Sequence, residues 1–176
     1  MRRIRYGVAM SLDGFIAGPN GEADWIIMDP AIDFGALFSQ FDTILVGRRT
    51  FEPMAREGRA TMPGMKTVVV SSTLRQQECP GVTIIAENAE RHVARLRAES
   101  GKDIWLFGGG ELFGRLLKVG LVDGVDVAVI PVMLGGGIPF LSPPADRTTL
   151  RLTDHHVYPT GIVSLQYSIK REQPET

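Results

Sequence analysis

Three consecutive glycines, Gly108, Gly109 and Gly110, directly follow an apolar run and precede a helix-like stretch. Glycine has no Cβ atom, so it adopts positive φ angles easily and lets a ligand come close to the backbone. The N–H groups of Gly109, Gly110 and Glu111 would then lie at a helix start, where free amides and the helix dipole favour an anion. The triplet therefore predicts a phosphate-binding turn, and a turn without a ligand is the alternative.

The sequence around the triplet matches neither of two widespread nucleotide-binding motifs. It is not G-x-G-x-x-G, and no Lys-Ser or Lys-Thr follows it as in the phosphate loop of nucleotide hydrolases. About 20 positions onward, where a dinucleotide site for NAD usually has an acid for the ribose hydroxyl, Ile130 lies among apolar residues. The pattern therefore disfavours an ordinary NAD site.

A second group of polar residues follows two other apolar runs. Arg48, Arg49 and Thr50 come after one run, and Ser71 and Ser72 after the next. A guanidinium can hold a phosphate through paired hydrogen bonds, and serine adds hydroxyl and amide donors. Two cations and two serines facing one crevice would suit an adenosine 2′-phosphate; a solvated basic helix start is the alternative.

Asp33 and Leu37 lie four residues apart in a helical apolar pattern, so they share one helix face. A carboxylate beside an apolar wall can anchor the N–H groups of a pterin or pyrimidine, or donate a proton during its reduction. The alternative is an acid that stabilises the helix start. Trp25 is a further candidate for stacking on a heterocycle, whereas Trp105 lies in an apolar run and is expected in the core.

Composition limits the possible partners. The chain has 19 basic and 20 acidic residues and a formal net charge of −1, which gives no electrostatic basis for binding nucleic acid. No apolar stretch is long enough for a membrane span. The single Cys79 and the absence of a visible export signal indicate the cytosol. Adjacent His155 and His156 would point to opposite faces of a strand, so no metal site is expected.

Short apolar runs that alternate with helical patterns position these candidates. Runs at 4–10, 43–46, 66–70 and 103–107 read as strands, and the first is followed by the turn pair Asp13-Gly14, interpreted as shaping a loop. The residues at 30–40 read as a helix. Such an alternation predicts an α/β fold with a mostly parallel sheet, whose ligands bind beyond the carboxyl ends of the strands.

The C-terminal region changes to alternating apolar and polar residues, which predicts a closing antiparallel strand pair. Residues 1–170 are expected to form a single domain, and residues 171–176 a polar tail. Asp13-Gly14 is interpreted as turn chemistry and Cys79 as incidental.

Five motifs in this order resemble the dihydrofolate reductase-like superfamily. The most similar branch is that of stand-alone proteins related to the C-terminal reductase domain of the bifunctional riboflavin-biosynthesis deaminase/reductase. The motifs are Ser11-Leu12-Asp13-Gly14, Val46-Gly47-Arg48-Arg49-Thr50-Phe51-Glu52, Val69-Val70-Ser71-Ser72, Phe107-Gly108-Gly109-Gly110 and Pro131-Val132-Met133-Leu134-Gly135-Gly136-Gly137.

The resemblance implies a twisted, mostly parallel sheet flanked by helices, with NADPH across the strand ends. It places Ala9 and Ile16 at the nicotinamide, and Arg48 and Ser72 at the 2′-phosphate. It assigns Asp33 to the pterin-binding acid and Leu37 to the substrate wall. The phosphates would meet Gly47, Arg48, Arg49 and Thr50, and the pyrophosphate would meet Gly108, Gly109, Gly110, Glu111 and Leu112.

The expected function is that of an NADPH-dependent reductase acting on a small-molecule substrate, either a pteridine- or pyrimidine-like heterocycle or another compact oxidised compound. A true dihydrofolate reductase and a non-catalytic NADPH-binding protein are the alternatives. The resemblance also implies a homodimer. The riboflavin enzymes commonly have a lysine in the first strand, where this chain has Val8 or Gly7, and the zinc deaminase signature is absent, so a role in riboflavin synthesis is not expected.

Overall fold

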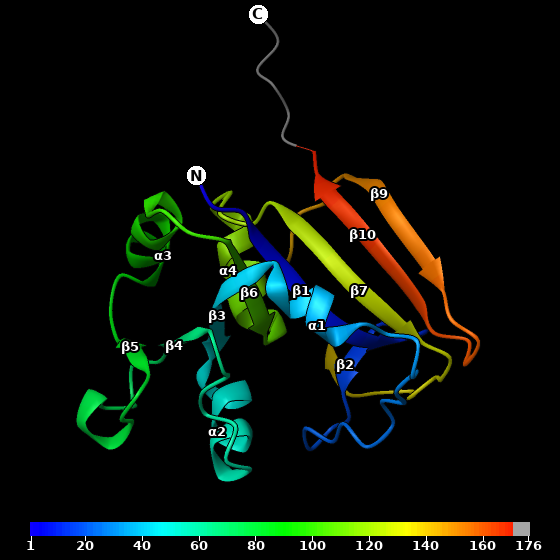
Figure 1. Ribbon diagram of the computed structural model, residues 1–176, viewed down its shortest axis with the longest axis horizontal. Coiled ribbons are helices and arrows are strands. Elements are labelled where there is room, and N and C mark those ends of the chain that lie inside the picture. Colours follow the sequence, from blue (N-terminus) through cyan, green and yellow to red (C-terminus); the bar gives the residue numbers. More distant parts are fainter. Residues whose placement is uncertain (171–176) are drawn as a thin grey trace, which may run out of the picture.

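The apolar runs form the centre of one eight-stranded sheet in the computed structural model, which describes residues 1–170; the expected tail at 171–176 lies outside them. The strand order is β5-β4-β3-β6-β1-β7-β10-β9 (Figure 1). The strands are β1 (Ile4–Ser11), β3 (Phe41–Gly47), β4 (Lys66–Val70), β5 (Thr83–Ile85), β6 (Asp103–Gly108), β7 (Gly124–Ile130), β9 (Leu150–Val157) and β10 (Val163–Ile169). All four predicted strand runs are confirmed.

Strand direction separates the sheet into two parts. β5, β4, β3, β6, β1 and β7 pair in parallel, whereas β10 pairs antiparallel with both β7 and β9. The mostly parallel sheet and its closing antiparallel pair are therefore confirmed. The carboxyl ends of the parallel strands lie at one edge, where ligands bind in such sheets.

Helices cover both faces of the sheet. They are α1 (Phe34–Ser39), α2 (Arg48–Arg56), α3 (Ala89–Ala98) and α4 (Gly110–Lys118), with a short 3₁₀ helix at Gln76–Glu78. One core cluster joins the sheet to α3 and α4, and a second joins it to α2. α1 contacts β3 and passes in front of β1 in the view of Figure 1. Within residues 1–170, no helix combines the length and the apolar character that crossing a bilayer requires.

The helix predicted over 30–40 is shorter at its start than expected. Asp33 has a non-helical ψ of 87°, and its side chain accepts a hydrogen bond from the Ala36 N–H, which places it at the cap position. The residues before it form a turn in which the Ala31 N–H donates to Asp29 Oδ1 at 2.8 Å. Asp29 also accepts from the Thr160 hydroxyl at 2.7 Å. The turn therefore fastens α1 to the β9–β10 hairpin, which the apolar periodicity did not reveal.

The Asp13-Gly14 pair forms a turn, as predicted, and it also holds a distant loop. Gly14 has a φ of 92°. The Asp13 carboxylate accepts from the Leu134 N–H at 3.0 Å and from the Gly135 N–H at 2.7 Å. These bonds lie beside the small sheet that pairs β2 (Phe15–Ala17) with β8 (Ile138–Pro139). Asp13 therefore positions the 134–139 segment against the end of β1.

We expect the Asp13 bonds to make stability depend on pH. The hydrogen bond from the Ser11 hydroxyl, followed by that from the Leu134 N–H, lowers the pKa of Asp13 from 3.8 to about 2. A carboxylate whose pKa is lower in the folded state than in the unfolded state stabilises the fold. This stabilisation is complete at pH values above the unfolded-state pKa and is lost as the pH falls through the folded-state pKa. Asp13→Asn should therefore lower the Tm at pH 7, and the difference from wild type should shrink between about pH 4 and pH 2. Melting curves across this range measure it.

Asp24→Asn supplies a matched control, because Asp24 is exposed and the structure gives its carboxylate no hydrogen bond among residues 1–170. Its Tm difference from wild type should stay near zero throughout. A gap for Asp13→Asn that is the same at pH 2 and pH 7 would contradict the assigned bonds.

Candidate functional site

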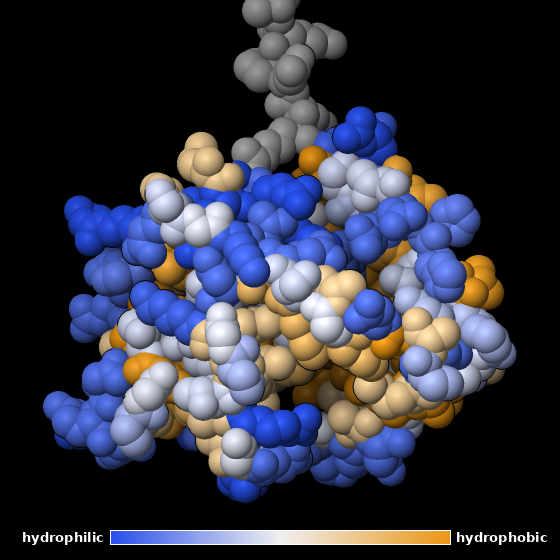
Figure 2. Space-filling model, viewed as in Figure 1, coloured by the Kyte–Doolittle hydropathy of each residue, from blue (hydrophilic) through white to orange (hydrophobic). Residues whose placement is uncertain are grey.

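A large cavity of about 2400 Å³ lies at the carboxyl ends of the parallel strands, on the face that carries α1 and α2. Figure 2 shows its mouth as a hollow in the surface with apolar residues inside. The three predicted turns meet there: the lining includes Gly47, Arg48, Arg49, Thr50, Ser71, Ser72, Gly108, Gly109, Gly110, Glu111 and Leu112. The expectation that these turns face one crevice is confirmed.

Two helix starts converge at one end of the cavity, here called the cofactor end. The cap residues are Gly47 for α2 and Gly109 for α4, and neither helix start has a side-chain capping bond. The two helix starts lie close together. A Cβ atom added to Gly108 or to Gly109, which precede α4, would stand 3.4 Å from Oγ1 of Thr50 in the first turn of α2. Free amides at two adjacent helix starts form a strong site for an anion.

Arg48 lies beside these helix starts. Its Nε donates to Glu52 Oε1 at 2.7 Å, and its Nη1 donates to Thr73 Oγ1 at 2.8 Å. The side chain is 47% exposed, so part of the guanidinium remains accessible. Thr73 was missed by the sequence analysis, although it directly follows the serine pair.

The two serines differ in role. Ser71 is buried, and its Oγ accepts from the Thr73 N–H at 3.2 Å and from the Leu74 N–H at 3.0 Å. Ser72 is exposed at the cavity. Ser71 therefore shapes the turn, and Ser72 is available at the cavity.

Further arginines surround the cofactor end. Arg49 is 91% exposed and lies 3.8 Å from Glu111, which is too loose to hold either side chain. Among residues 1–170, the arginines that line the cavity are Arg48, Arg49, Arg56, Arg59 and Arg115. They come from α2, the loop after it, or α4, and they outnumber the lining acids of the same segments, Glu52, Glu57 and Glu111.

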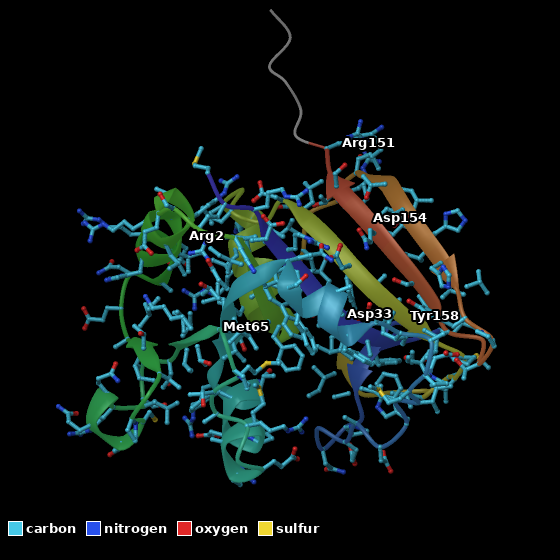
Figure 3. All side chains as sticks on the ribbon, viewed as in Figure 1. Arg2, Asp33, Met65, Arg151, Asp154 and Tyr158 are labelled. Atoms are coloured by element: carbon cyan, nitrogen blue, oxygen red, sulfur yellow. The ribbon has the colours of Figure 1, made fainter. Side chains whose placement is uncertain are left out.

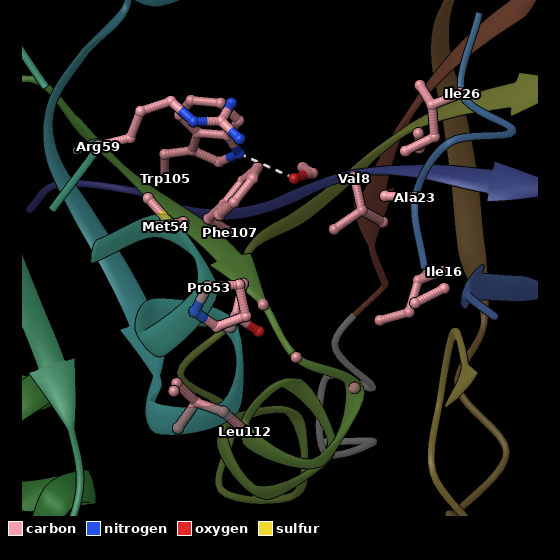
Figure 4. Close-up of a pocket in the computed structure, with 18 of the residues that line it drawn as sticks. Val8, Ile16, Ala23, Ile26, Pro53, Met54, Arg59, Trp105, Phe107 and Leu112 are labelled. Carbon is pink, nitrogen blue, oxygen red and sulfur yellow. Dashed lines mark hydrogen bonds between the residues drawn. The ribbon is translucent and has the colours of Figure 1, made fainter. Parts of the chain in front are cut away.

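The other end of the cavity, here called the substrate end, has apolar and aromatic walls (Figure 4). Ala9, Ile16 and Leu37 line it. Trp105 stacks on Phe38 with centroids 5.3 Å apart and meets the edge of Phe107 at 4.9 Å. The sequence analysis placed Trp105 in the core, but it is half-buried and lines the cavity, because its indole lies between the sheet and α1.

Asp33 caps a helix and also lies at the cavity. Its Oδ1 accepts from the Ala36 N–H at 2.8 Å, so it caps α1. The side chain is also exposed and lines the cavity, and Figure 3 places it at the end of α1. Trp25 lies outside the lining residues, and its indole N–H donates to the Glu22 carbonyl at 3.0 Å. The structure thus brings Asp33 to the cavity and leaves Trp25 apart.

The sequence analysis missed the polar floor of the substrate end. Asp126 on β7 and Ser164 and Gln166 on β10 line the cavity. Burial raises the pKa of the Asp126 carboxyl, and the Arg5 guanidinium opposes this shift. A charged residue inside the otherwise apolar run of β7 was the available signal.

The chain is similar to known proteins over most of its length. The sequence model of the RibD C-terminal domain matches residues 2–164. The uncharacterized protein YyaP of Bacillus subtilis is 34% identical in an alignment 178 positions long, which covers 94% of each chain. A solved protein of Shewanella sp. PV-4, provisionally assigned to riboflavin biosynthesis, is 26% identical with a TM-score of 0.80; the alignment covers 97% of this chain and 100% of that one.

The fold extends to a more distant structure. Dihydrofolate reductase from Enterococcus faecalis, solved in complex with NADP(H), is 20% identical with a TM-score of 0.69, over 96% of this chain and 97% of that chain. At this identity the comparison shows a shared fold, and it agrees with the dihydrofolate reductase-like architecture expected from the sequence.

Proposed function

This chain belongs to the RibD C-terminal domain family, and from that premise we propose that it is an NADPH-dependent reductase. Its substrate in this proposal is a small pteridine- or pyrimidine-like heterocycle or another compact oxidised compound. The observation that carries the proposal is the convergence of two uncapped helix starts beside Arg48, at one end of a cavity whose other end is aromatic. Such a cavity offers a polar end to phosphates and a flat apolar end to two stacked rings.

The residues present fit NADPH. The amides after Gly47 and Gly109 would hold its phosphates, and Arg48 with Ser72 and Thr73 would hold the 2′-phosphate. Ala9 and Ile16 would border the nicotinamide, since both line the cavity. NADPH, when bound, supplies the hydride, and the protein orients it against the substrate.

The substrate end supplies binding and proton transfer. Leu37 and Phe38 on α1 and Trp105 on β6 would enclose a flat ring and exclude water from it. Asp33 would accept hydrogen bonds from ring N–H groups. The proton that balances the transferred hydride would reach the product from Asp33 or from an ordered water.

Asp33→Asn tests this proposal. Purified protein with NADPH should oxidise the cofactor in the presence of at least one member of a panel of oxidised pteridines, pyrimidines and dihydrofolate. The variant should lower kcat/KM by about 100-fold or more, as is typical when an acid–base group is lost, while NADPH affinity stays the same. Asp24→Asn, on the same segment but outside the cavity lining, is the control.

The same assay separates the alternatives. Dihydrofolate as the best substrate would favour a true dihydrofolate reductase. Tight NADPH binding without hydride transfer to any member of the panel would contradict catalysis and favour a non-catalytic binding protein.

We propose that two copies pair through the β9 side of the sheet. β9 is an edge strand, and Leu150, Leu152 and Val157 are 38%, 48% and 64% exposed on it. An edge strand with an unpaired backbone side and exposed apolar side chains is a template for association with another chain. Light scattering should give twice the mass of the chain, and Leu152→Arg should shift it to one copy; a wild-type monomer at high concentration would contradict this assembly.

A further inference from the structure

The floor of the substrate end consists of residues aligned across three strands. Asp126 on β7 lies directly opposite Gly7 on β1 and Gln166 on β10. Residues paired in this way point to the same face of a sheet, and all three line the cavity. Gly7 has no side chain, and the Trp105 indole occupies the space above it: a Cβ atom at Gly7 would stand 2.5 Å from Trp105 Nε1, which donates to the Gly7 carbonyl at 2.9 Å.

A neighbouring row lies at the position proposed for the nicotinamide. Ala9, Ala128 and Ser164 are paired across the same strands and line the cavity. Residues two apart on a strand are separated by about 6.6 Å along it. A flat substrate that stacks on the nicotinamide near Ala9 can therefore extend over Ala128 and meet Asp126, which lies two residues away on β7.

The Arg5 guanidinium holds the Asp126 carboxylate in one orientation. Arg5 is 5% exposed, and its Nε donates to Asp126 Oδ2 at 2.7 Å. Its Nη1 donates to Gln40 Oε1 at 2.7 Å, and the guanidinium also lies over the Phe41 ring at 4.9 Å from its centroid. Among residues 1–170, no donor bonds Asp126 Oδ1. Oδ1 is thus an oriented acceptor beside the cavity.

The cavity lining carries charges of both signs. Glu22, Asp33 and Asp126 line it away from the two helix starts, whereas the arginines of α2 and α4 share their part of the cavity with Glu52 and Glu111, and Arg59 lies beside Trp105 (Figure 4). Arg5 is engaged by its own acceptors and does not line the cavity. At Asp126 itself, the carboxylate therefore favours a neutral or cationic ring that carries hydrogen-bond donors over an anionic group.

From these observations we infer that Asp126 Oδ1 accepts a hydrogen bond from a ring N–H or amino group of the substrate, which makes Asp126 a specificity-determining residue. The inference rests on the proposed reductase function and names its substrate class: a flat heterocycle that presents donors, and no phosphate, to the sheet. Asp126 and Asp33 would contact the substrate from different sides, since Asp126 belongs to the sheet and Asp33 to the start of α1.

Binding of two related heterocycles tests the inference. With NADPH present, 2,4-diaminopteridine offers amino donors, whereas 1,3-dimethyllumazine has carbonyl oxygens at the same positions and methyl groups in place of the ring N–H donors. Calorimetry should show tighter binding of diaminopteridine by the wild type. Asp126→Asn should weaken diaminopteridine about tenfold or more, as expected for a lost hydrogen bond to a charged group, and leave the NADPH Kd unchanged.

Asp103→Asn is the matched control. Asp103 lies 3.5 Å from the same guanidinium but does not line the cavity. If Asp126 acted only by holding Arg5, the two variants would weaken diaminopteridine equally, and that result would overturn the inference. Unchanged diaminopteridine affinity in Asp126→Asn would overturn it as well.

Two further measurements keep the test decisive. Should Asp126→Asn fail to fold because Arg5 loses a buried partner, the double variant Arg5→Gln/Asp126→Asn removes both charges and should show the same loss of diaminopteridine binding. Wild type that binds NADPH but neither heterocycle would overturn the role of Asp126 and leave the cofactor proposal intact, whereas failure to bind NADPH would overturn the proposed function itself.

Discussion

Arg48→Leu is expected to lower the affinity for NADPH about 10- to 100-fold and to leave the affinity for NADH unchanged. The two cofactors differ in the 2′-phosphate, which Arg48 would contact beside Ser72 and Thr73. A hydrogen bond to a charged group contributes about 1.5–3 kcal/mol, which corresponds to this range of affinity. Calorimetric Kd values for both cofactors with both proteins measure the change.

The comparison needs a control for the loss of a positive charge. Arg91 on α3 is exposed and does not line the cavity. Arg91→Leu removes the same charge far from the helix starts, and its NADPH affinity should match that of the wild type. An equal loss of NADPH and NADH affinity in Arg48→Leu would show that Arg48 does not recognise the 2′-phosphate.

Gly110→Ala is expected to destabilise the fold by about 1–3 kcal/mol, the usual cost of overpacking, and to weaken NADPH binding. A Cβ atom at Gly110 would stand 2.6 Å from the Pro139 carbonyl oxygen and 3.1 Å from that of Phe140. Both atoms belong to the backbone, so the start of α4 must move away from the 139–142 segment. That movement displaces the amides proposed to hold the pyrophosphate. Urea unfolding and NADPH titration measure the two effects.

Gly114→Ala separates steric contact from helix propensity. Gly114 lies on the same helix, and its added Cβ would meet Leu141 Cδ1 at 3.5 Å, an ordinary contact. Alanine is favoured over glycine inside helices by about 1 kcal/mol, so this variant should be as stable as the wild type or more stable. Equal stability changes in both variants would show that the approach of α4 to the 139–142 segment is not limiting.

The central architecture could be predicted because its signals are local. A strand buried on both faces gives a continuous apolar run, so the strands around 43–46, 66–70 and 103–107 and the turns after them were identified, and the structure brings those turns to one cavity. The predicted start of α1 was wrong. The apolar spacing continues back through Ile32 to Pro30, but the turn at Asp29 and the cap at Asp33 make the helix begin only at Phe34.

The polar floor could not be predicted because it depends on partners distant in sequence. Asp126 and Arg5 are 121 positions apart, and only the pairing of β1 with β7 brings them together. A single aspartate in an apolar strand does not indicate which side of the sheet it faces. Trp105 was assigned to the core for a similar reason, since its exposure depends on the gap between α1 and the sheet.

Thermal unfolding of the wild-type protein with NADPH and with NADH tests the account most directly. A ligand that binds only the folded state stabilises it by about 2.7 kcal/mol at a concentration of 100 Kd, which raises the Tm. We predict a clear rise with NADPH and a much smaller one with NADH at the same concentration. No rise with NADPH, or an equal rise with NADH, would contradict the assignment of the helix starts and Arg48 to an NADPH site.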